Sequence, residues 1–130
     1  ELVIRVGEYL ESITSTVRMI HFSGLSEIYP AHIEMADINY QASIETGGII
    51  KLLVDTKRNR SYIILGCETL NTLETRAKEV HYSELLKLIV ASENMAQVTK
   101  IKNILESFMR CACQTNSTVE IIRTILRKSS

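Results

Sequence analysis

The N-terminal twenty residues carry the most regular pattern of apolar side chains in this sequence. The apolar positions alternate at spacings of three and four without a slip: Val3, Val6, Leu10, Ile13, Val17 and Ile20. This spacing is the a/d pattern of a helix that packs along its length. Gly24 follows shortly afterwards, and glycine commonly stands just past a helix C-terminus. We therefore predict a helix here and call its six apolar positions the N-terminal seam.

The N-terminal seam has two interpretations. The first, which we expect, is that it packs into the protein's own helical bundle. The second is that it forms an interaction surface for another chain, because β-branched residues together with Leu10 suit a short coiled coil. Three heptads hold such a pair together only with help from the rest of the domain.

A second apolar segment follows Pro30, the only proline in the chain. Its apolar residues recur at helical spacing and form a broad face: Ile33, Met35, Ile38, Tyr40, Ala42 and Ile44. Gly47-Gly48 then interrupts the pattern, and two glycines cost a helix about 1–2 kcal/mol relative to alanine. We favour a helix that continues through them. The alternative is a short β-hairpin around residues 49–65, in which residues 49–54 would pair with residues 62–65, because both segments are rich in β-branched residues.

The rest of the chain repeats the helical spacing with short polar interruptions. We expect helices over residues 62–80, 83–90, 95–112 and 119–126, with a polar break at residues 114–117 before the last one. Short connections between amphipathic helices favour antiparallel neighbours. The predicted fold is all-α, a four- to six-helix antiparallel bundle formed as a single domain by residues 1–130. Because the chain starts at Glu1 without a methionine, we expect a domain excised from a longer protein.

Charge and hydropathy narrow the choice of partners. Fifteen basic residues balance fifteen acidic ones, whereas a nucleic-acid-binding protein usually has a positive excess. No run of apolar residues is long enough to cross a membrane. One compact basic cluster, with Lys57, Arg58 and Arg60, is a candidate contact loop. Nucleic acid is therefore an unlikely partner, and this loop is where it would bind.

Catalytic and metal-binding patterns are missing from the sequence. None of the three histidines follows a glutamate by three residues, as the metal sites of helical bundles require. Cys111 and Cys113 could supply two thiolates, but no third metal ligand lies nearby in the sequence. There is no glycine-rich phosphate loop and no nucleophile elbow. We therefore predict no catalytic, cofactor or metal residues, and a protein that is not an enzyme.

The cysteines bear on the cellular compartment. Three of them, an odd number, indicate free thiols and an intracellular, cytoplasmic location. Two glycosylation-type triplets, at Asn59 and Asn116, leave a secreted helical ligand as an alternative.

The function that we expect is a non-enzymatic helical module for protein–protein interaction or oligomerisation, which binds another protein or itself. The other alternative is a nucleic-acid-binding helical domain that uses the basic loop.

Overall fold

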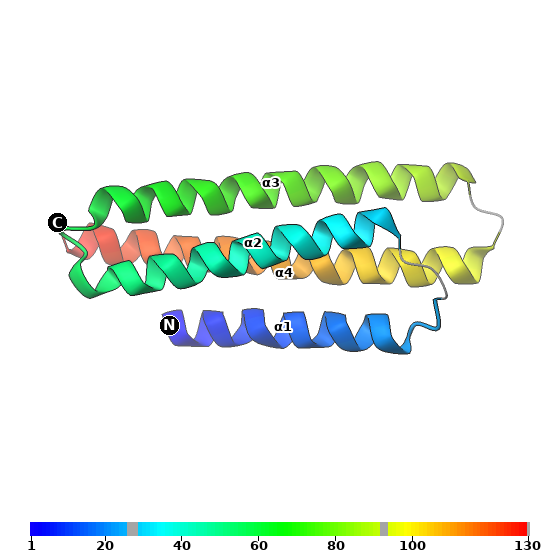
Figure 1. Ribbon diagram of the computed structural model, residues 1–130, viewed down its shortest axis with the longest axis horizontal. Coiled ribbons are helices and arrows are strands. Elements are labelled where there is room, and N and C mark those ends of the chain that lie inside the picture. Colours follow the sequence, from blue (N-terminus) through cyan, green and yellow to red (C-terminus); the bar gives the residue numbers. More distant parts are fainter. Residues whose placement is uncertain (26–28, 92–93, 130) are drawn as a thin grey trace.

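The computed structural model describes residues 1–25, 29–91 and 94–129, and these residues form helices and turns without a strand. The helices are α1 (Leu2–Phe22), α2 (Pro30–Leu52), the short 3-10 helix η1 (Leu53–Asp55), α3 (Arg60–Ala91) and α4 (Met95–Lys128). The four long helices run side by side, each antiparallel to the next (Figure 1). The all-α bundle is thus confirmed. The alternative hairpin around residues 49–65 is wrong, because that region comprises the end of α2, η1 and the start of α3.

Local signals account for several helix ends. Pro30 occupies the first turn of α2, where its missing N–H is not needed. At the start of α4, the Asn94 side chain accepts hydrogen bonds from the backbone N–H groups of Ala96 and Gln97, at 3.1 and 3.3 Å. After α1, Gly24 has a φ of 71°, a left-handed conformation that favours glycine.

Helices α3 and α4 are longer than the sequence pattern predicts. The expected helix over residues 83–90 is the end of α3, and the polar break at residues 114–117 lies inside α4. Within α4 the Thr115 hydroxyl donates to the Ala112 carbonyl at 2.6 Å, and the Thr118 hydroxyl donates to the Gln114 carbonyl at 3.2 Å. Because the helix satisfies these hydroxyls itself, polar residues there do not end it. The predicted break was wrong.

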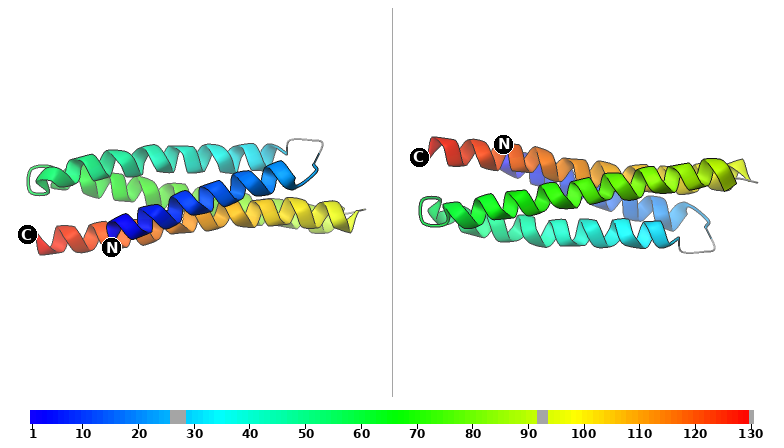
Figure 2. Two further views of the ribbon diagram at one scale, coloured as in Figure 1. Left: turned by 90° about the horizontal axis from the view of Figure 1, so that it is seen from below. Right: turned by 90° about the horizontal axis from the view of Figure 1, so that it is seen from above.

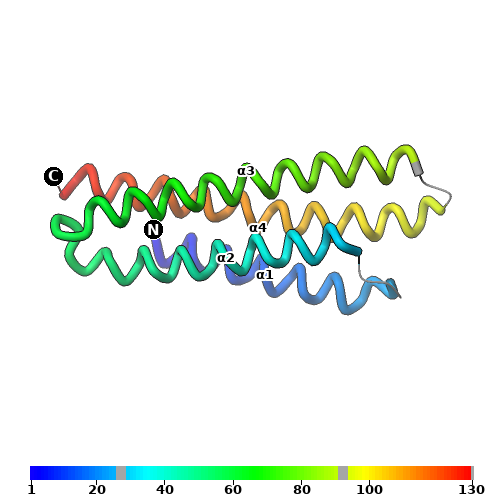
Figure 3. Tube along the Cα trace, turned by 45° about the horizontal axis from the view of Figure 1, so that its top comes forward, coloured from blue at the N-terminus to red at the C-terminus, as the bar shows by residue number. Residues whose placement is uncertain are grey.

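Helices α2, α3 and α4 lie side by side (Figure 3), and the buried apolar residues of these three helices form the core. Helices α2 and α3 approach closely at Gly66, where an added Cβ atom would lie 2.6 Å from Cγ1 of Ile49. Helix α1 packs mainly against α4 and crosses it obliquely (Figure 2). Of its apolar side chains, Tyr9 is buried, and Leu2 and Met19 are partly buried against the core. Three helices therefore form the core, and α1 is an outer layer.

Candidate protein-interaction surface

The structure places the N-terminal seam largely on the outside of the protein. Val3, Leu10, Val17 and Ile20 are exposed, whereas Val6 and Ile13 are half-buried. The side chains that α1 buries are instead Tyr9 and Thr16. This differs from our expectation that the seam packs into the bundle. Four of the six positions thus form a surface that the described chain leaves uncovered, and the other two are partly covered.

Polar contacts determine which side of α1 faces the bundle. The Thr16 hydroxyl donates to the Ser12 carbonyl at 2.8 Å, so it accepts a hydrogen bond from the Ser107 hydroxyl of α4 at 2.6 Å. The Tyr9 hydroxyl donates to the Asn39 carbonyl of α2 at 3.0 Å, and burial raises the pKa of Tyr9 to about 12. Since these buried hydroxyls are bonded only in this orientation, they hold the apolar seam outward.

Helix α2 extends the uncovered apolar surface. A groove of about 280 Å³ lies between α1 and α2, and its walls include Ile13, Val17 and Ile20 of α1 and Ala36, Tyr40 and Ser43 of α2. Buried residues of α4, Phe108 and Cys111, also line it. We define the α1–α2 face as the N-terminal seam together with the following α2 residues: Ile33, Ala36, Tyr40, Ser43 and Ile44. A concave apolar surface between two helices is the shape that an amphipathic helix fills.

One buried polar atom at this groove has no partner. The side chain of Asn39, which lines the groove, is only 6% exposed. Its Nδ2 donates to the carbonyls of Met35 and Phe108, at 2.9 and 3.4 Å, which fixes the orientation of the amide. Its Oδ1 has no hydrogen-bond donor among the residues that the structure describes. This oxygen is itself buried, so the surface that the groove presents is almost entirely apolar.

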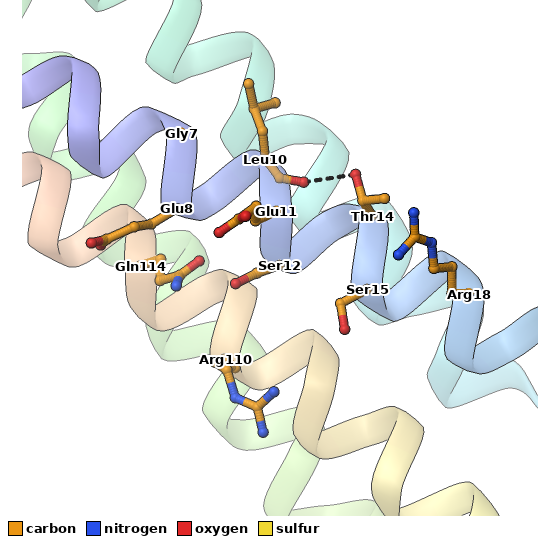
Figure 4. Close-up of a pocket in the computed structure, with 10 residues that line it drawn as sticks. All are labelled: Gly7, Glu8, Leu10, Glu11, Ser12, Thr14, Ser15, Arg18, Arg110 and Gln114. Atoms are coloured by element: carbon orange, nitrogen blue, oxygen red, sulfur yellow. Dashed lines mark hydrogen bonds between the residues drawn. The ribbon is translucent and has the colours of Figure 1, made fainter.

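Three charged residues of α1 line a depression on its other side. Figure 4 shows this depression of about 640 Å³ between α1 and α4, lined by Glu8, Glu11, Arg18 and Arg110 and also by the seam residue Leu10. In this view Leu10 points away from α4, whereas Ser12 and Ser15 point toward it. The depression is thus lined by charged residues and the α1–α2 groove is not, and the seam residue Leu10 borders the depression.

The predicted basic loop lies between η1 and α3, at the end of the bundle where α4 ends (Figure 1). Lys57 and Arg58 are exposed there. The Arg60 guanidinium donates to the Leu126 carbonyl at 3.0 Å, in the last turn of α4, which the cationic group also stabilises through the helix dipole. The neighbouring Asn59 donates through Nδ2 to the Leu52 carbonyl at 3.0 Å. Arg60 therefore has a structural role, and Asn59 uses its amide within the fold, whereas Asn116 is exposed.

Other chemistry on the described residues is sparse. No three of their His, Cys, Asp and Glu side chains are placed to hold a metal ion. Cys67 and Cys111 are buried free thiols, and Cys113 is an exposed one. Across residues 1–25, 29–91 and 94–129, no helix has the length and hydropathy needed to cross a membrane.

The α2 half of the face was not identified from the sequence. The sequence pattern predicts one broad apolar face on this helix. In the structure that face divides into a buried part, with Met35, Ile38 and Ala42, and an exposed part, with Ile33, Tyr40 and Ile44. The breadth of that face was the available signal, because a helix turns only part of its circumference toward one core. No protein-family model and no curated protein sequence matches this chain.

Proposed function

We propose that this protein is a non-enzymatic helical interaction module that binds an apolar helix of a partner on the α1–α2 face. The observation that carries the proposal is the exposed N-terminal seam beside the groove. Isolated apolar residues are common on protein surfaces, but an apolar stripe along a whole helix, continued on its neighbour, is typical of a binding site.

The composition of the groove supports the same function. Its lining contains no charged residue, and most of its walls are apolar side chains of α1, α2 and α4. Burial of such apolar walls against the apolar side of a helix supplies the free energy of binding. The basic loop offers a weaker site, since Arg60 already bonds to α4.

A photocrosslinking experiment tests the proposed function. The variant Tyr40→p-benzoylphenylalanine places a reactive group in the groove, and Tyr62→p-benzoylphenylalanine is the matched control on α3. The two tyrosines are 64% and 67% exposed, so accessibility alone does not distinguish them. On illumination in the native cells, we expect a discrete protein adduct at position 40 and none at position 62.

The added substitution Leu10→Glu should abolish that adduct, because it places a carboxylate on the apolar face. Absence of an adduct at position 40, or equal adducts at both positions, would contradict the proposed function. Persistence of the adduct in the Leu10→Glu variant would place the binding surface elsewhere.

The free thiols suit an intracellular location as part of this proposal. Cys113 is exposed and unpaired, which is the usual state of a thiol in a reducing compartment. Intact-mass analysis of the protein from its native cells tests this, with an unmodified mass and free thiols as the expected result.

A further inference from the structure

The N-terminal seam is compatible with pairing against itself. Reversing the direction of a helix exchanges its two ends, and the alternation of three- and four-residue steps reads the same both ways. In an antiparallel pair centred between residues 11 and 12, Val3 faces Ile20, Val6 faces Val17, and Leu10 faces Ile13. Every apolar position of one seam then meets an apolar position of the other.

The α1–α2 face also supplies both parts of a two-fold interface. Its ridge is the exposed seam of α1, and its groove lies alongside, with Ile13, Val17 and Ile20 in one wall. When α1 of one copy enters the groove of another, the symmetry places the second α1 in the groove of the first. A surface that complements itself in this way is what an isologous dimer requires.

The distribution of charge favours a second copy as the occupant. The seam and the groove lining hold no charged residue, and the charges of α1 lie at Glu1, Arg5, Glu8, Glu11 and Arg18, outside the seam. On α2 the carboxylate of Asp37 accepts a hydrogen bond from Gln41 at 2.7 Å. The chain has a formal net charge of zero, so two copies do not repel each other. An uncharged apolar face binds best to another uncharged apolar face, and a second copy of this chain supplies one.

The size of the face suits a dimer as well. Helix α1 has 21 residues and is therefore about 31 Å long. With α2 beside it, the face is about 20 Å wide, which corresponds to roughly 600 Å² on each copy. Stable protein–protein interfaces cover about 600–1,000 Å² on each partner, so the area of the face corresponds to the lower end of that range.

We propose that the occupant of the α1–α2 face is a second copy of this chain, in a two-fold dimer with antiparallel α1 helices. This inference rests on the proposed function, because it names the partner for the same face. The interface then contains four helices, α1 and α2 from each copy, arranged around the two-fold axis. In this arrangement each copy covers the apolar face that the other leaves exposed.

Sedimentation or light scattering of the purified protein tests the association. From about 1 to about 100 µM, we expect a mass that rises to twice the 14.7 kDa of one chain. The variant Leu10→Glu should weaken the dimer by about 100-fold, since the symmetry buries the carboxylate twice. Leu86→Glu, on α3, is the matched control, because Leu10 is 57% exposed and Leu86 is 61% exposed. The control should dimerise like the unmodified protein.

Disulfide crosslinking tests the antiparallel register. With Cys113→Ser as background, chains carrying Val3→Cys are mixed with chains carrying Ile20→Cys, and mild oxidation should give a covalent dimer of the two variants. Val3→Cys alone should give none, because residues 3 of the two copies lie about 26 Å apart in this register, beyond the reach of a disulfide. A covalent dimer of Val3→Cys chains alone would overturn the antiparallel arrangement.

The outcomes separate this inference from the proposed function. A purified protein that stays monomeric over the whole range, while Tyr40→p-benzoylphenylalanine still crosslinks to a different protein in cells, overturns the dimer and leaves the interaction module intact. A dimer that is lost with Leu86→Glu but not with Leu10→Glu overturns the proposed interface. A dimer that is lost only with Leu10→Glu, with crosslinking between positions 3 and 20, supports it.

Discussion

Helices α1 and α4 carry apolar patterns of the same kind, yet one pattern is exposed and the other is buried. In α4 the residues Ile101, Leu105, Phe108 and Ala112 lie in the core. In α1 the equivalent positions Val3, Leu10 and Val17 face outward, and polar contacts attach the other side of the helix to α4. The difference teaches that periodicity specifies an amphipathic helix, whereas the surrounding helices decide whether its apolar side is covered.

We expect the two helices to differ most in the stability that the protein loses when one leucine in each is replaced by alanine. Leu105→Ala removes a fully buried side chain and should lower the free energy of unfolding by about 2–5 kcal/mol. Leu10→Ala should lower it by less than about 1 kcal/mol, because the side chain is exposed. Denaturant unfolding measures both, at protein concentrations that keep the chain monomeric. Equal losses would show that α1 is packed as tightly as α4.

Glycine substitutions extend the comparison to backbone packing. In Gly66→Ala the new methyl group meets Ile49, which is buried and cannot move away, so a loss of about 1–3 kcal/mol is expected. Gly7→Ala, on α1, meets no atom within 4 Å and should gain about 0.5–1 kcal/mol from improved helix propensity. Thermal unfolding of the two variants should shift in opposite directions. A destabilised Gly7→Ala monomer would contradict the open surface that the structure gives α1.

The attachment of α1 depends on Thr16, and Thr16→Val tests how firmly it is held. The substitution leaves the buried Ser107 hydroxyl without its partner and should cost about 1–2 kcal/mol. Because α1 is the outer helix, we expect the loss as faster amide hydrogen exchange in α1, with α2, α3 and α4 unchanged. A uniform increase over all four helices would mean that α1 unfolds only together with the core.

The same contrast explains how much could be predicted from the sequence. The helix over residues 3–20 and the passage of α2 through Gly47-Gly48 were predicted correctly, because apolar spacing continues across both. The interruption at residues 114–117 was not, since the hydroxyls of Thr115 and Thr118 bond to carbonyls of their own helix. The outward direction of the seam depends on contacts of Tyr9 and Thr16 with residues far along the chain, which local spacing does not reveal.

The smallest of these effects is a pH dependence that belongs to the core and not to α1. His32 of α2 is buried, and its Nε2 lies 3.2 Å from the Ile101 carbonyl of α4. Burial lowers the pKa of His32 below its usual 6.5, while the Ile101 hydrogen bond and the Glu84 carboxylate partly offset this. The effect is therefore expected to be modest.

Its sign follows from proton binding. Below pH 6.5 the unfolded chain takes up a proton that the folded His32 resists, so the free energy of unfolding should decrease as the pH falls from 6.5 toward the folded-state pKa. Denaturant unfolding at a series of pH values measures this decrease, and His32→Gln should reduce its slope because glutamine does not titrate. If the slope were unchanged in that variant, the acid sensitivity would have to arise outside the contact between α2 and α4.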